Sequence, residues 1–269
     1  MARKTIDHMQ SLLTDNYENL EYWEPYLDSD EKDFDGHATN NLFKSNLKIA
    51  VYEYIINKNI EIFREHLLKA IQYGLYNIRK YDQGLPIRNS HVSYARREVG
   101  SINLLNYALV LGSPKLVNIV AAEVKFRKNP EESKGKFLPI MHVYSELALG
   151  HVQSASDFLL QARNNPILGV ECGVHDPYFF VFDIILRKKK YSEKEIIHLF
   201  NKAYKVFIKN KYCTWASTVY EDLNLEAIAY LNLLRFYGFE VNIPQDILIP
   251  SELLVDPSVA PYRHLMFEI

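Results

Sequence analysis

The sequence predicts an all-α protein, built as an irregular stack of antiparallel helical hairpins with an extended, proline-containing C-terminal tail. Apolar residues recur at three- and four-residue steps in segment after segment, which is the period of amphipathic helices. The 269 residues include only 10 glycines and 11 prolines, gathered at a few places, so long uninterrupted helices are expected. Strand-like alternation is nearly absent.

Two of these amphipathic helices are expected in runs of helically spaced apolar residues within 47–55 and 60–75. Gly84 and Pro86 should end the second run, since glycine suits a helix C-terminus and proline cannot continue a helix.

Two helical hairpins should follow, each with a glycine at its turn. The expected arms are 92–111 and 115–128 about Gly112, then 138–149 and 152–163 about Gly150. The two turns lie 38 residues apart, a spacing typical of helical repeats. Because the consensus positions of a tetratricopeptide unit are absent, an irregular stack is the better description.

Three more helices are expected at 177–189, 193–210 and 221–237, the last ended by Gly238. Residues 239–269 contain four prolines, which permit only short turns and extended pieces. We expect this tail to pack along the body, so that residues 1–269 form a single helical domain.

The charge of the chain is unevenly distributed. Nine acids and one lysine between Asp15 and Asp35 give that segment a charge of −8 within a chain of −2, so the remainder carries about +6. Aromatic residues are interleaved with the acids, and such a surface can anchor a basic protein while steering its approach. The acidic N-terminal segment, 15–36, is therefore the predicted partner-binding site. Its proposed contact residues are Glu18, Glu21, Trp23, Glu24, Asp28, Asp30, Glu31, Asp33 and Asp35.

A simpler interpretation of the same segment stays open. The acids would form a solvated helix face and a flexible loop, and the aromatic residues would only hold that loop against the body.

Composition argues against several other classes of protein. A net charge of −2 and a pI near 6.5 give no overall attraction to nucleic acid. The longest apolar run, 178–186, is about half the length of a membrane helix. Two cysteines and no apolar leader predict a cytoplasmic protein.

No cofactor is expected, because glycine-rich phosphate loops, nucleophile elbows and paired metal-ligand motifs are all missing. Cys172 and His175 supply at most two of the four ligands of a zinc site. The chain is therefore expected not to be an enzyme; the enzyme alternative would use His91, Arg96 or His142.

The C-terminal third, YEDLNLEAIAYLNLLRFYGFEVNIPQDILIPSELL at 220–254, resembles the immunity protein 49 family of bacterial polymorphic-toxin systems. The family's last helix has a small-and-aliphatic run ending in glycine, then a valine-containing extended piece and an apolar-proline step. The matching residues here are Leu225, Ala227, Ala229, Leu231, Gly238, Val241, Ile249, Pro250 and Leu254.

The similarity extends upstream to SINLLNYALVLGSPKLVNIVA at 101–121 and to DPYFFVFDIILRKKKYSEKEIIHLFNKAY, and so covers about 100–254. Two positions depart from the family pattern: Phe236-Tyr237 replaces an acidic-arginine-like step, and Ile249 replaces an aromatic residue before Pro250.

The resemblance implies an all-helical cytoplasmic antitoxin that binds a cognate bacterial toxin stoichiometrically and occludes its active site, without catalysis. A basic toxin would suit the acidic N-terminal segment. The alternative is a repeat-like helical adaptor that binds a cellular protein or peptide in a concave face.

Overall fold

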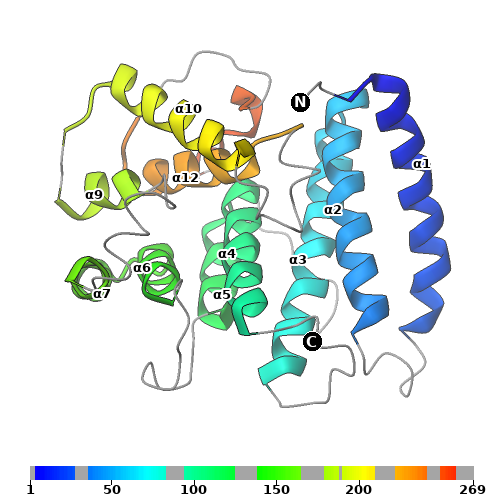
Figure 1. Cartoon of the computed structure of the whole chain (residues 1–269), viewed down its shortest axis with the longest axis horizontal. Helices are drawn as coiled ribbons and strands as arrows, with labels where there is room; N and C mark the ends of the chain where they lie inside the picture. Colours follow the sequence, from blue (N-terminus) through cyan, green and yellow to red (C-terminus); the bar gives the residue numbers. More distant parts are fainter. Residues whose placement is uncertain are drawn as a thin grey trace.

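The protein is all-α, as the sequence predicts. The computed structural model describes residues 4–27, 36–82, 94–124, 138–164, 179–187, 190–209, 222–240 and 249–258. These residues form ten α-helices and two short 3-10 helices, and they include no strand longer than one bridge residue, Ile249 (Figure 1).

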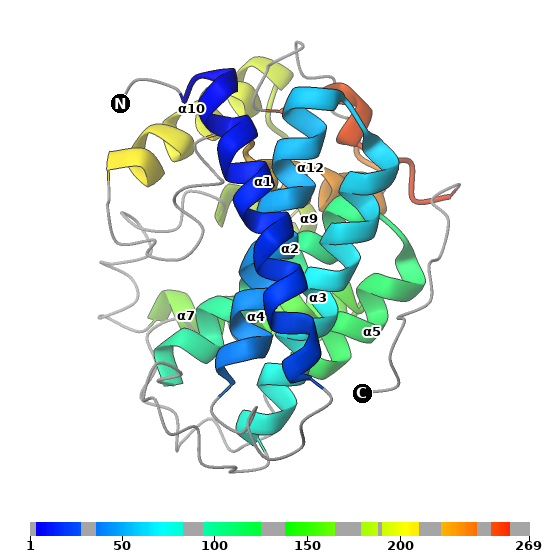
Figure 2. The same cartoon turned by 90° about the vertical axis from the view of Figure 1, so that its right-hand side faces the viewer.

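Three long helices form one side of the molecule, and they run alternately down and up (Figure 1). They are α1 (Ile6–Trp23), α2 (His37–Asn57) and α3 (Ile60–Asp82). α2 packs against both of the others, and α1 is the outermost of the three (Figure 2).

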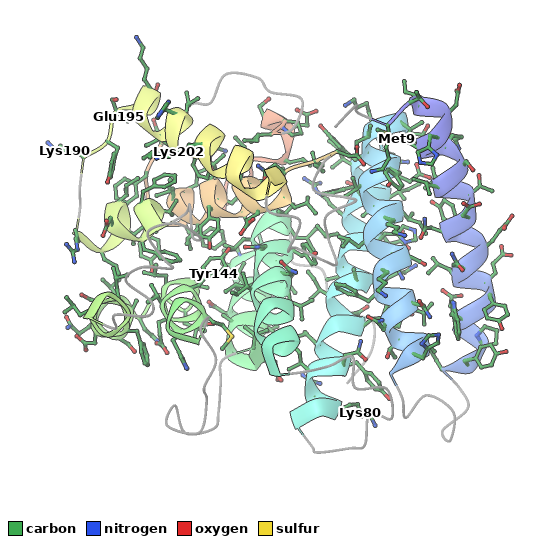
Figure 3. All side chains as sticks on the ribbon, in the orientation of Figure 1. Met9, Lys80, Tyr144, Lys190, Glu195 and Lys202 are labelled. Atoms are coloured by element: carbon green, nitrogen blue, oxygen red, sulfur yellow. The ribbon has the colours of Figure 1, made fainter. Side chains whose placement is uncertain are left out.

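α1 is an amphipathic helix with a narrow apolar stripe. Its buried residues are Met9, Leu13, Asn16 and Leu20, spaced so that they share one side of the helix. Met9 lies where α1 faces α2 (Figure 3). The remaining side of α1 is left to solvent.

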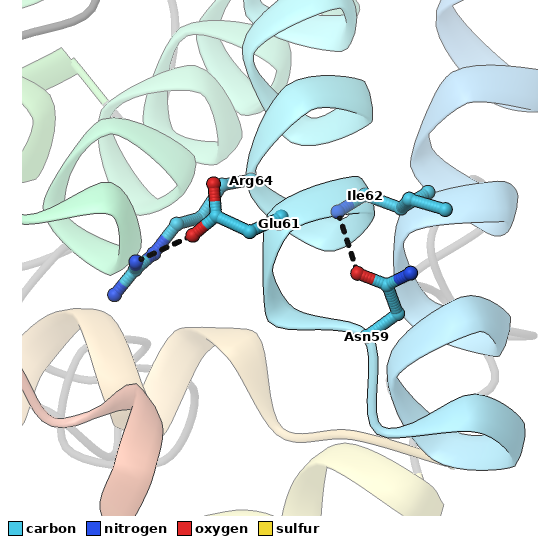
Figure 4. A network of polar contacts seen from close by, with 4 residues as sticks. All are labelled: Asn59, Glu61, Ile62 and Arg64. Atoms are coloured by element: carbon cyan, nitrogen blue, oxygen red, sulfur yellow. Dashed lines mark hydrogen bonds and ion pairs between the residues drawn. The ribbon is translucent and has the colours of Figure 1, made fainter.

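The turn between α2 and α3 is tight because its residues supply the conformations that two helix ends require. Lys58 adopts a left-handed φ of 53° and closes α2 through its backbone N–H. Asn59 then accepts a hydrogen bond from the backbone N–H of Ile62 at 3.1 Å, which caps the start of α3 (Figure 4). Glu61 and Arg64 add an exposed ion pair at 3.3 Å.

The two predicted hairpins are present; the first lies in the middle of the molecule and the second toward the end opposite α1 (Figure 1). They are α4 (Tyr94–Leu111) with α5 (Pro114–Val124), and α6 (Leu138–Ala148) with α7 (Val152–Asn164). Gly112 and Gly150 have φ of 75° and 78° at the ends of their first helices, a conformation that glycine adopts without strain. α4 contacts α3, α5, α6 and α12 and so forms the centre of the fold.

Three further helices of the described residues contribute to the core: α9 (Phe179–Arg187), α10 (Glu193–Lys209) and α12 (Leu225–Phe236). Tyr144 of α6, labelled in Figure 3, stacks on Tyr230 of α12 with ring centroids 4.9 Å apart. Its hydroxyl donates to Asn106 of α4 at 2.5 Å, and Phe182 of α9 packs against both tyrosine rings. Four helices therefore meet around one buried aromatic group.

Residues 249–258, the C-terminal strap, include the 3-10 helix η4 (Ser251–Leu253) and pack across α4 and α12. The buried side chain of Asn232 holds three backbone groups together. Its amide nitrogen donates to the carbonyls of Leu109 at 2.9 Å and Leu253 at 3.3 Å, and its oxygen accepts from the N–H of Val255 at 3.1 Å. Tyr54 of α2 also donates a hydrogen bond to Glu252 of the strap.

Candidate partner-binding surface

The structure places four of the predicted contact residues together at one end of α1. Glu18, Glu21 and Trp23 lie on the helix, and Glu24 opens the 3-10 helix η1 (Glu24–Tyr26). The other five predicted contacts lie outside the described residues; they are Asp28, Asp30, Glu31, Asp33 and Asp35.

Glu18, Glu21 and Tyr22 point away from the body, because they fall on the side of α1 opposite its buried stripe. All three are exposed, and Tyr22 keeps 58% of its surface open to solvent. Figure 2 looks directly onto α1, the outermost helix on this side. We call the following six residues the acidic–aromatic surface: Glu18, Glu21, Tyr22, Trp23, Glu24 and Tyr26.

The carboxylates of this surface are placed where they destabilise their own helix. A helix C-terminus carries partial negative charge and favours cations, yet the last turn of α1 holds Glu21 and no basic residue. Glu18 and Glu21 are three residues apart and repel one another. Among the described residues, neither they nor Glu24 forms an ion pair. The negative charge is therefore not neutralised by any ion pair within the part of the chain that the structure describes.

The negative charge of one further acid of α1, Asp15, is partly balanced by a lysine of the same chain. Asp15 favours the charged form of Lys48 on α2, but burial and the nearby Lys4 have larger effects and lower the pKa of Lys48 below its usual range. Asp15 is accordingly not included in the acidic–aromatic surface.

The aromatic members of the surface form a packed group. Tyr22 meets Trp23 edge-on, with centroids 4.9 Å apart, and Tyr26 lies 5.6 Å from each of them. The ring of His37, at the start of α2, packs against Trp23 at 5.0 Å. A hydrogen bond with Tyr26 raises the pKa of the Tyr22 hydroxyl. These contacts hold the rings in place at the α1–α2 corner.

A polar network behind α1 fixes the helix on the body. Tyr17 donates from its hydroxyl to Glu53 of α2 at 2.9 Å, and Asn57 donates to the other oxygen of Glu53 at 2.7 Å. The Tyr17 ring also meets His66 of α3 edge-on at 5.8 Å, and His66 Nδ1 lies 2.8 Å from the Asn46 oxygen. Burial and the bond to Glu53 raise the pKa of Tyr17, so this hydroxyl stays protonated as a donor.

His66 gives this network a dependence on pH. Burial, followed by the nearby Lys69, lowers the pKa of His66 to about 4, against the opposing effects of Glu65 and Glu53. In the unfolded chain the pKa of this histidine is near 6.5. Between pH 6.5 and 4, His66 is therefore protonated in the unfolded chain and neutral in the folded protein. This site's contribution to stability is complete above pH 6.5 and is lost as the pH falls.

We expect the free energy of unfolding to fall between pH 6.5 and 4 by up to about 3 kcal/mol more in the native protein than in His66→Gln. Urea denaturation at a series of pH values measures this difference, and because the carboxylates titrate in both proteins, their effects cancel. Parallel curves for the two proteins would contradict the assignment.

Of the residues of the enzyme alternative, the structure describes only the side chain of His142. His142 is buried and stacks on Phe158 of α7 at 4.7 Å, as part of the α6–α7 packing. His91, Cys172 and His175 lie outside the described residues, as does the side chain of Arg96. Within the described ranges, no three acidic, histidine or cysteine residues are grouped as metal ligands.

Sequence reasoning identified the acidic end of α1 but did not select Tyr22. Its position opposite the Met9–Leu13–Leu20 stripe is the signal that could have singled it out.

None of the helices in the described part of the chain combines the length and apolar character that crossing a bilayer requires.

No family model, curated protein or solved structure matches the chain. The resemblance to the immunity protein 49 family therefore rests on the sequence pattern of residues 100–254 alone.

Proposed function

We propose that the chain is an immunity protein that binds a basic bacterial toxin stoichiometrically and occludes its active site in the cytoplasm. The observation that carries the proposal is the acidic end of α1, where Glu21 opposes the helix dipole, Glu18 repels Glu21, and neither forms an ion pair with another described residue. Features that lower the stability of a free protein are expected at functional surfaces. A basic partner would relieve both repulsions on binding.

The fold suits a protein that presents one rigid face. The stripe on α1 and the Tyr17–Glu53 hydrogen bond hold the acidic–aromatic surface on the α2–α3 pair, so little ordering is required when a partner arrives. Opposite charge across the interface would speed association and orient the partner.

The first test is survival of cells that express the toxin encoded beside this gene, with and without this chain, together with co-purification of the two proteins. Rescue with a stable 1:1 complex is the expected result. Growth arrest that persists, with no complex, would reject the immunity function. A stable complex with a host protein instead of a toxin would favour the adaptor.

Charge reversal tests the proposed surface. Glu21→Lys should slow association with the toxin by about three- to tenfold at low salt, because it removes a steering charge and adds an opposing one. The free protein should be as stable as the native chain or slightly more so, since a lysine suits the end of α1. Stopped-flow association at low and high salt, with a thermal melt of each variant, measures both effects.

Asp157→Lys is the matched control, because it changes the net charge equally on α7, at the other end of the molecule from α1 (Figure 1). Asp157 is exposed and accepts one hydrogen bond from Gln153 at 3.1 Å. Equal slowing by both variants would show that only net charge matters and that the interface lies elsewhere.

A further inference from the structure

Tyr22 and the carboxylates beside it have the composition of a site for one particular side chain. Glu18 lies one helical turn before Tyr22, so the two are neighbours on the outer side of α1. Glu21 lies three residues after Glu18 and neighbours it, so that two carboxylates and an exposed aromatic ring share the outer side of α1.

The ring is held before any ligand arrives. Trp23 packs against it edge-on at 4.9 Å, Tyr26 lies 5.6 Å away, and Trp23 itself contacts His37. Although Tyr22 is 58% exposed, its neighbours therefore restrict its movement. An aromatic anchor that is ordered in the free protein loses little entropy on binding.

A guanidinium group matches this arrangement better than an ammonium group does. Arginine is planar, stacks on aromatic rings and pairs with carboxylates through a fork of N–H donors, whereas lysine is a compact and strongly hydrated charge. We propose that Tyr22, with Glu18 and Glu21, binds an arginine side chain of the basic partner. This step rests on the proposed function for the class of partner, and it names the side chain that the surface recognises.

Two labelled peptides of equal charge, hexa-arginine and hexa-lysine, test the site without the toxin. Fluorescence anisotropy at low salt should show that the native protein binds hexa-arginine about three- to tenfold more tightly than hexa-lysine. Tyr22→Leu should remove most of this preference while leaving lysine-peptide binding nearly unchanged, because the charges remain. Glu18→Lys combined with Glu21→Lys should weaken both peptides.

Tyr76→Leu is the control for loss of a tyrosine elsewhere. Tyr76 of α3 already has Lys80 over its ring, 5.1 Å from the centroid, so its loss should leave the arginine preference intact. Equal affinity for both peptides, or a preference that survives Tyr22→Leu, would overturn the arginine site. Toxin rescue without an arginine preference would reject only this inference, and an arginine preference without rescue would reject only the immunity function.

Discussion

Replacing Gly112 with alanine is expected to lower the free energy of unfolding by about 2–4 kcal/mol. Gly112 has a φ of 75°, which is strained for alanine, and an added Cβ would lie 2.0 Å from one methyl carbon of Val255 and 2.8 Å from its Cβ. Because the Val255 Cβ is itself too close, a change of rotamer cannot remove the overlap. The strap must move away from the end of α4. Chemical denaturation of the purified variant measures the loss.

Gly150→Ala separates backbone strain from the clash. Gly150 has nearly the same φ, 78°, but a Cβ there meets no atom within 4 Å. This variant should therefore lose only about 1 kcal/mol. Adding Val255→Ala to Gly112→Ala should recover part of the lost stability. Equal destabilisation by the two glycine substitutions would show that the strap does not press on Gly112.

Asn232→Leu should cost about 3–5 kcal/mol of unfolding free energy. The leucine has a similarly branched side chain but cannot bond the carbonyls of Leu109 and Leu253 or the N–H of Val255, which are partly or fully buried groups. These backbone groups would lose their side-chain partner away from water. Denaturation curves at neutral pH give the difference directly.

Arg235→Met provides the comparison on the same helix. Arg235 donates one hydrogen bond to the carbonyl of Leu254 at 2.9 Å, in a partly exposed position. Its loss should cost about 1 kcal/mol. A cost for Asn232→Leu no larger than that of Arg235→Met would mean that the buried amide does not hold the strap.

Much of the fold could be predicted from local sequence signals. The hairpin helices end close to where Gly112, Pro114 and Gly150 predict, because these residues act on the few residues around them. The helices at 193–209 and 225–236 likewise follow from apolar spacing and a terminal glycine.

Other features depend on contacts that local spacing does not encode. The approach of Val255 to Gly112 and the bond from Asn232 to Leu109 join residues more than a hundred positions apart. At the candidate surface, composition indicated the acidic residues, and the burial of one side of α1 shows that Glu18 and Glu21 lie on its exposed side. The acids of 28–35 stay a prediction, because they lie outside the described residues.

Contacts between the first helices and later parts of the chain also determine the order in which parts of the fold can form during synthesis. Lys4 pairs with Asp222 at 2.5 Å across 218 positions, and Tyr54 bonds Glu252 across 198. At ribosomal rates of about 5–20 residues per second, Asp222 is synthesised about 10–40 s after Lys4. Contacts within α1, α2 and α3 are close in sequence and form quickly by comparison. The helix that carries the acidic–aromatic surface can therefore dock on α2 early in synthesis, whereas the contacts that lock the fold form last.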